Sequence, residues 1–133
     1  MTTKTTTPHV PVSWGELIDK ITILEIKRDR LESESALANV RRELDALRVM
    51  TDPVLAADAE AAAITAKLKT VNETLWDIED RIRGKEAARA FDEEFIDLAR
   101  AVYKRNDERA ALKKQLNLKL ASELVEEKSY KPY

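Results

Sequence analysis

Cysteine is absent from this chain of 133 residues, and histidine occurs once, at His9. Without cysteine there is no disulfide framework and no cysteine-based zinc or redox site. A single histidine also excludes a cluster of histidine ligands or a Ser-His-Asp triad within one chain. We therefore expect no metal ion and no cofactor, and we assign no catalytic residue.

Glycine, proline and aromatic residues are scarce, with two glycines, four prolines and an aromatic content of 5%. So few turn-forming residues argue against a β-sandwich or β-barrel with many tight turns. No stretch approaches the run of about 18 apolar residues that spans a membrane. The N-terminal segment has no apolar signal-peptide core, so the expected location is cytoplasmic.

Charged residues, by contrast, make up 36% of the chain, and Ala, Leu, Glu, Lys and Arg dominate. This composition is typical of long helices and coiled coils. The net charge of −2 argues against non-specific nucleic-acid binding by the whole domain. Residues 100–119 are basic, but only Tyr103 interleaves closely with their charges, so no nucleic-acid partner is expected.

Two segments of different character are predicted. Residues 1–11 contain five threonines and two prolines, which predicts a disordered N-terminal arm. Residues 12–133 are expected to form one helical domain that ends in a tail from about residue 122. Its first helix should begin with Ser13 as N-cap and Glu16 three residues later, the pattern of a capping box.

Two interruptions are expected in the first half of this domain. The apolar pattern loses phase near residues 32–36, which predicts a break between a first and a second helix. A third helix should start at Asp52 and Pro53, because Asp is a good N-cap and Pro fits the first helical position. The second helix should therefore stop at about Met50.

The third helix should end or kink at Gly84, and a fourth should open with Asp92 as N-cap. The spacing of apolar residues in the third helix is that of a coiled coil: Ile64, Leu68, Val71, Leu75, Ile78 and Ile82. The predicted fold is all-α, an elongated antiparallel helical bundle of three to four helices with two long coiled-coil-like helices. Such a bundle has a thin core, which favours a homodimer.

Polar residues interrupt the apolar stripes at Arg28, Asn106 and Arg109, and Asn72 could join them from the third helix. Arginine and asparagine inside a bundle can receive a carboxylate or phosphate, since guanidinium binds both in a bidentate manner. Alternatively, each arginine reaches the surface or forms an ion pair that fixes the helix register.

The start of the first helix carries Trp14 and Gly15. Glycine is unfavourable in a helix, so Gly15 indicates close approach of another group. That group could be an anion at the positive end of the helix dipole, another helix or the returning tail. Trp14 is interpreted as a core or interface anchor. Tyr130 either docks the tail onto the bundle or a partner, or belongs to a solvated tail.

Four strings of residues resemble an uncharacterised bacterial family of short all-helical proteins: SWGELIDKITILEIK (13–27), NETLWDIED (72–80), AVYKRNDER (101–109) and EEKSY (126–130). They include Trp14, Gly15, Asn72, Trp76, Tyr103, Asn106, Arg109 and Tyr130. The resemblance covers residues 11–130 and implies an association with glycosyltransferases and cell-surface polysaccharide genes. It supplies no catalytic residues. The segment Leu17–Ile21, followed by Arg28, also resembles the first helix of the all-helical chorismate mutases, although no matching set of site residues follows.

The sequence thus leads to one expected function and two alternatives. The expected function is a non-enzymatic helical interaction module, dimeric, with a protein partner in surface-glycan synthesis. One alternative is a binding module for an anionic small molecule such as a nucleotide sugar. The other is a small helical enzyme such as a chorismate-mutase-like isomerase, with Glu79 or Glu16 as general acid or base.

Overall fold

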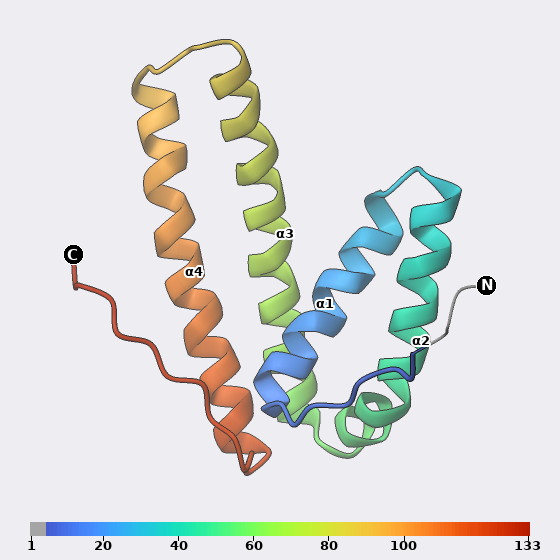
Figure 1. Cartoon of the computed structure of the whole chain (residues 1–133). Helices are drawn as coiled ribbons and strands as arrows, with labels where there is room; N and C mark the ends of the chain where they lie inside the picture. The colour runs from blue at the N-terminus through green and yellow to red at the C-terminus, as the bar shows by residue number, and fades with distance from the viewer. Residues whose placement is uncertain (1–4) are drawn as a thin grey trace.

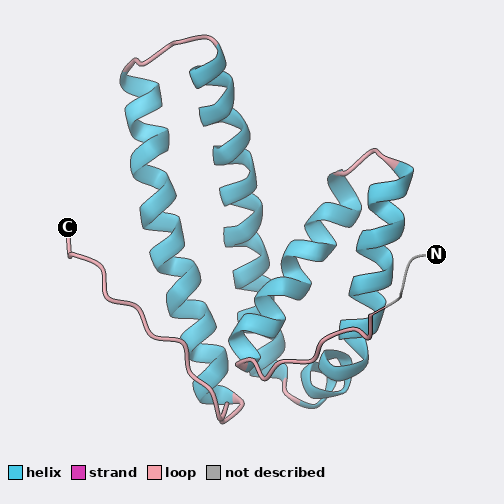
Figure 2. Cartoon of the chain, in the orientation of Figure 1, coloured by secondary structure: helices cyan, strands magenta, loops and turns pink. Residues whose placement is uncertain are grey.

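The computed structural model describes residues 5–133, and in that range it contains four α-helices and no strand (Figure 2). The helices are α1 (Trp14–Arg30), α2 (Glu34–Ala57), α3 (Ala59–Ala87) and α4 (Glu93–Lys119). The predicted all-α class is confirmed. None of these helices is both long and apolar enough to cross a membrane.

The helices form two antiparallel hairpins that diverge like the arms of a V (Figure 1). The α1–α2 hairpin is the shorter arm, and the α3–α4 hairpin extends well beyond it. Helix α1 contacts each of the other three helices, whereas α2 and α4 do not touch. With 29 and 27 residues, α3 and α4 are the two long helices that the sequence predicts. At 1.5 Å per residue, each spans about 40 Å.

Two hydrophobic clusters hold the hairpins together. The first joins α1, α3 and α4 and contains Ile18, Ala61, Leu68 and Leu116, each 0% exposed. The second joins α1 and α2 through Ile21, Leu24, Val40 and Leu44. Because α1 contributes to both clusters, it is apolar around most of its circumference.

Each helix begins with an N-cap side chain that accepts a backbone N–H bond, as expected for orphan helix donors. Ser13 Oγ accepts from Glu16 N at 3.1 Å, and Asp92 Oδ1 accepts from Phe95 N at 3.0 Å. Both predicted N-caps are confirmed. Ser33 caps α2, so the break expected near residues 32–36 is also present.

The predicted boundary at Asp52 and Pro53 is wrong. Helix α2 continues through Pro53 and ends at Ala57, and Asp58 caps α3 instead. Continuing the helix places Leu55 against the first hydrophobic cluster. The buried apolar surface offsets the backbone hydrogen bond that proline cannot make, an interior cost of about 3 kcal/mol.

The third helix does not stop at Gly84 but runs three residues further. Its C-terminus is closed by Arg89, which adopts a left-handed conformation with φ 53°, and by a hydrogen bond from Ala90 N to Lys85 O at 2.9 Å. This is a Schellman motif, where glycine is the usual residue. Helix α4 ends in the same way, with Ala121 at φ 49°.

Candidate functional site

The N-terminus of α1 lies directly against the C-terminal part of α4. A Cβ atom on Gly15 would lie 2.4 Å from Lys113 O and 2.9 Å from Asn117 Oδ1, so only glycine allows this approach. Gly15 N donates to Asn117 Oδ1 at 2.7 Å, and Trp14 N donates to Ser122 Oγ at 3.1 Å. The close approach predicted at Gly15 is therefore to a helix.

The same contacts occupy the first turn of α1. The remaining two N–H groups of this turn, on Glu16 and Leu17, donate to the side chain and the carbonyl of Ser13. All four donors at the positive end of the helix dipole thus have protein partners. An anion has no free backbone donor here, which removes one basis of the anionic-ligand alternative. Trp14 is half-buried, in keeping with an anchor.

A buried polar cluster lies one turn further along, where α1, α3 and α4 meet. Its centre is the carboxylate of Asp19, a residue that is 1% exposed. Arg109 of α4 donates to Asp19 Oδ1 from Nε at 3.0 Å and to Oδ2 from Nη2 at 2.5 Å. Asn72 Nδ2 donates to Asp19 Oδ1 at 2.9 Å and to Thr22 Oγ1 at 2.8 Å. The bidentate pair is the strong form of an arginine–carboxylate bond.

Arg109 and Asn106, both predicted as site residues, come together on α4. Arg109 Nη1 lies 3.5 Å from Asn106 Oδ1, and Asn106 Nδ2 donates to Val102 O at 3.1 Å. Hydrogen bonding to Asp19 raises the pKa of Arg109, against the opposing effect of burial. Arg109 therefore stays charged, and its three guanidinium nitrogens all have protein partners.

Arg28, the third predicted member of this group, lies elsewhere. It is near the C-terminal end of α1, and its Nε donates to Asp29 Oδ1 at 3.2 Å. The structure therefore brings together Asn72, Asn106 and Arg109 but not Arg28. The partner of Arg109 on α1 is instead Asp19.

Sequence reasoning missed Asp19 and Thr22 as members of the cluster. Two signals could have identified them. Asp19 stands among the apolar residues Leu17, Ile18 and Ile21, which predicts burial, and buried carboxylates are paired. Moreover, Gly15, Asp19, Thr22 and Ile26 follow one another at spacings of four, three and four, which places them on one side of the helix.

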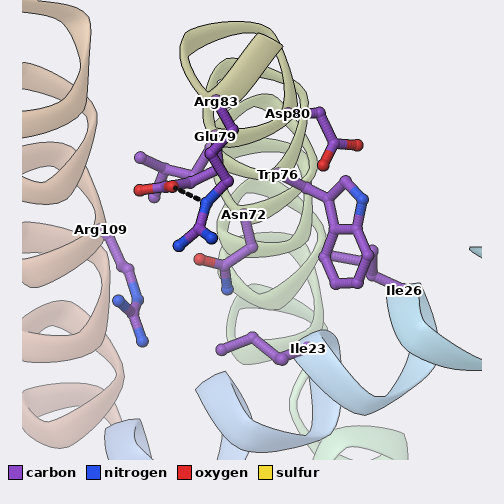
Figure 3. Close-up of a pocket in the computed structure, with 9 residues that line it drawn as sticks. Ile23, Ile26, Asn72, Trp76, Glu79, Asp80, Arg83 and Arg109 are labelled. Atoms are coloured by element: carbon purple, nitrogen blue, oxygen red, sulfur yellow. Dashed lines mark hydrogen bonds and ion pairs between the residues drawn. The ribbon is translucent and has the colours of Figure 1, made fainter. Parts of the chain in front are cut away.

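A notch of about 360 Å³ opens beside this cluster, between α1, α3 and α4 (Figure 3). Two of its lining residues come from α1, Ile23 and Ile26, and one from α4, Arg109. The other six lie on one side of α3: Asn72, Leu75, Trp76, Glu79, Asp80 and Arg83. The predicted candidate Trp76 forms part of its wall. The guanidinium of Arg30 lies over the Trp76 ring, 5.8 Å from its centroid, and holds this wall in place.

The C-terminal tail, residues 122–133, runs back along α4 in extended form (Figure 1). Lys113 Nζ, on α4, binds Glu16 Oε2 at 2.7 Å and Glu126 Oε2 at 2.8 Å. Hydrogen bonding from Lys113 lowers the pKa of Glu126. Burial alone would lower the pKa of Lys113, but its two carboxylate partners outweigh burial and raise it. The tail is thus tied to α4 and, through Glu16, to α1.

The end of the tail is held by tyrosines. Tyr133 Oη donates to Asp107 Oδ2 at 2.6 Å, and the rings of Tyr103 and Tyr133 lie 5.0 Å apart. Lys128 Nζ lies over the ring of Tyr130 at 5.4 Å. Between the tail and α4 is a groove of about 730 Å³, which these side chains line together with Asn106 and Arg109. Glu126 and Tyr133 hold the tail on α4, whereas Tyr130 is 78% exposed and stacks only with Lys128 of the tail itself.

The two carboxylates considered as general acid or base are both in ion pairs. Glu16 binds Lys113, and Glu79 Oε2 lies 3.2 Å from Arg83 Nε. Both side chains are about half exposed, which leaves them in ordinary solvent contact. Within residues 5–133, no group of three or more acidic or histidine side chains is placed to hold a metal ion.

Comparison with known proteins adds a family but no activity. No curated protein and no solved structure matches this chain significantly. A family model does match, over residues 8–133, and its description is a family of unknown function, DUF6165. Since this match covers nearly the whole chain, including the polar cluster, the notch and the tail, the protein belongs to that family.

Proposed function

We propose that this chain is a non-enzymatic helical interaction module that binds a partner protein through one surface, the α4–tail face. This face consists of Tyr103 on α4 and of Lys128, Tyr130, Lys131 and Tyr133 in the tail. Tyr130 and Tyr133 are 78% and 75% exposed. Tyrosine is enriched in protein interfaces because its ring buries a large area while its hydroxyl keeps a polar partner. The exposure of these rings is the observation that carries the proposal.

The face is also ordered before any partner arrives. The ion pair of Glu126 with Lys113 and the hydrogen bond of Tyr133 tie both halves of the tail to α4. A tail that is already ordered loses little conformational entropy on binding, which favours affinity. Lys128 and Lys131 lend the face positive charge, so the complementary partner surface is acidic.

We also propose that the module is a homodimer. The chain exposes 9523 Å² of surface. A compact monomer of its mass, 15.1 kDa, would expose about 7,100 Å². The difference, roughly 2,400 Å² per chain, lies at the upper end of the roughly 1,000–2,500 Å² that each subunit buries in an obligate homodimer interface. Light scattering during gel filtration should give twice the chain mass, and a mass of 15.1 kDa at micromolar concentration would refute the dimer.

The biological setting we propose is cell-surface glycan synthesis in the bacterial cytoplasm. Its support is the resemblance of the four sequence strings to proteins associated with glycosyltransferases. The partner on the α4–tail face would then be a protein of that machinery.

Cross-linking in the native cell, followed by affinity capture, tests the interaction surface. We expect Tyr130→Ser to abolish capture of a defined partner, because it removes the most exposed ring and leaves both anchors of the tail intact. Phe91→Ser is the matched control, since Phe91 is 58% exposed at the far end of the α3–α4 hairpin. Equal loss in both variants, or no loss in the first, would refute the α4–tail face as the binding surface.

A further inference from the structure

The notch between α1, α3 and α4 is lined by a side-chain acceptor that no protein donor reaches. Asn72 is 5% exposed, and its Nδ2 makes two hydrogen bonds, to Asp19 Oδ1 and Thr22 Oγ1. Both partners must accept, because one is a carboxylate and Thr22 gives its own hydroxyl hydrogen to Asp19 O at 2.7 Å. These contacts fix the amide so that Oδ1 points away from α1.

Asn72 Oδ1 has no hydrogen-bond partner among residues 5–133. In that range Thr51 Oγ1 is the only fully buried side-chain N or O atom without a partner. Asn72 Oδ1, which also has no partner, is therefore not fully buried, and it opens to the notch that Asn72 lines. In Figure 3 the amide oxygen faces the space between Arg83 and Arg109. A rigidly held carbonyl oxygen at the wall of a pocket calls for an N–H or O–H donor on a ligand.

The charged groups that line the notch are of both signs. Arg83 uses Nε for Glu79, while its two terminal nitrogens have no partner in the described chain. Arg109 Nη1 has only the long contact to Asn106. Asp80 lies beside Trp76 at the other end of the notch, and it forms no ion pair with residues 5–133. The notch is thus lined by two arginines and by two carboxylates, those of Glu79 and Asp80. This balance favours a ligand that carries both charges over a polyanion.

The rest of the wall is apolar. Ile26 of α1 and the ring of Trp76 line the side of the notch away from Arg109, and Ile23 of α1 lies between that side and Arg109 (Figure 3). Arg30 covers the Trp76 ring and is itself bound to Asp77 at 2.5 Å, so the wall is fixed. An apolar substituent of the ligand would be buried there.

From these three features we infer that the notch binds a free α-amino acid with an apolar side chain. Its carboxylate would lie between Arg83 and Arg109, its ammonium group against Asn72 Oδ1, and its side chain against Trp76. This inference is independent of the α4–tail face, which lies on the other side of Arg109.

Calorimetric titration of the full chain with L-leucine and L-phenylalanine tests the inference. Two further probes each lack one charge: 3-methylbutylamine has no carboxylate, and 4-methylpentanoate has no ammonium group. We expect at least one of the amino acids to bind, with a Kd that is lower than that of either half-ligand by about tenfold or more, equivalent to about 1.4 kcal/mol. A half-ligand that binds as tightly as the best amino acid, or no heat with either amino acid at about 10 mM, would overturn it.

Arg83→Met separates a specific site from a general surface effect. The Arg83 side chain is 80% exposed, so its replacement should leave the fold intact, as circular dichroism would verify. Arg81→Met is the matched control, because Arg81 is a neighbour on α3 that pairs with Glu94 outside the notch. We expect the Kd for the bound amino acid to rise by about tenfold in Arg83→Met alone. An unchanged Kd in that variant, or an equal loss in the control, would contradict the inference.

Discussion

The two glycines of the chain lie in helices and should respond in opposite ways to replacement by alanine. A Cβ atom at Gly15 would lie 2.4 Å from Lys113 O, whereas one at Gly84 would have no neighbour within 4 Å. Ordinary contacts between carbon atoms lie near 3.5–4 Å. Gly15→Ala therefore has to push α1 and α4 apart by about 1 Å, and Gly84→Ala requires no movement.

The free energies follow from these distances. Overpacking of the α1–α4 interface costs about 1–3 kcal/mol. Loss of the buried hydrogen bond from Gly15 N to Asn117 Oδ1, 2.7 Å long, costs about 1–3 kcal/mol more. The free energy of unfolding should fall by about 2–6 kcal/mol in Gly15→Ala. It should rise by about 0.5–1 kcal/mol in Gly84→Ala, because alanine favours the helix.

Urea denaturation followed by circular dichroism at 222 nm measures both changes. In thermal unfolding, a chain of this size should shift by roughly 3–5 °C per kcal/mol. The two variants should therefore differ by about 10 °C or more, on opposite sides of the parent protein. A Gly15→Ala variant as stable as the parent would show that α1 and α4 do not cross at this distance.

Three other changes test separate features. Arg109→Met should destabilise the fold by about 3 kcal/mol in urea denaturation, because it leaves the buried Asp19 carboxylate without its charged partner; an unchanged midpoint would refute the pairing. Arg89→Gly should raise the melting temperature by a few degrees, since glycine relieves about 1 kcal/mol of left-handed strain; a lower value would contradict the turn geometry. Because folding lowers the pKa of Glu126, its contribution is complete above pH of about 4.3 and is lost as the pH falls through the lower folded value. Protection of the tail amides from hydrogen exchange, corrected for the intrinsic rate at each pH, should then fall in acid, but not in Glu126→Gln, which already lacks the ion pair with Lys113.

Local chemistry made much of the fold predictable. The N-caps at Ser13 and Asp92 depend only on residues in their own helical turn, and both are as expected. The boundary at Pro53 was wrong because tertiary burial of Leu55 overrides the local preference of proline. The turn that starts beyond Gly84 uses Arg89, a residue that carries no local signal for a left-handed conformation.

The candidate site was less predictable, for a geometric reason. Apolar periodicity identifies which side of a helix is buried, but not which residues of two helices lie at the same level. Arg109 and Asn106 were selected as interruptions of apolar stripes and Asn72 as a residue that could join them, and the structure brings these three together. Arg28 was selected by the same rule, yet it lies near the end of α1 beside Asp29, away from the other two. The register became clear only from the contacts of Asp19.

The capping of α1 by the end of α4 has a consequence for how the protein is made. The bonds from Gly15 to Asn117 and from Trp14 to Ser122 connect residues that are 102 and 108 positions apart. A ribosome adds about 5–20 residues per second, so α1 waits roughly 5–20 s for its final partners after it is synthesised. Until then the Asp19 carboxylate also lacks Arg109. The nascent chain can form the α1–α2 hairpin early, but the native arrangement of α1 forms only when translation is almost complete.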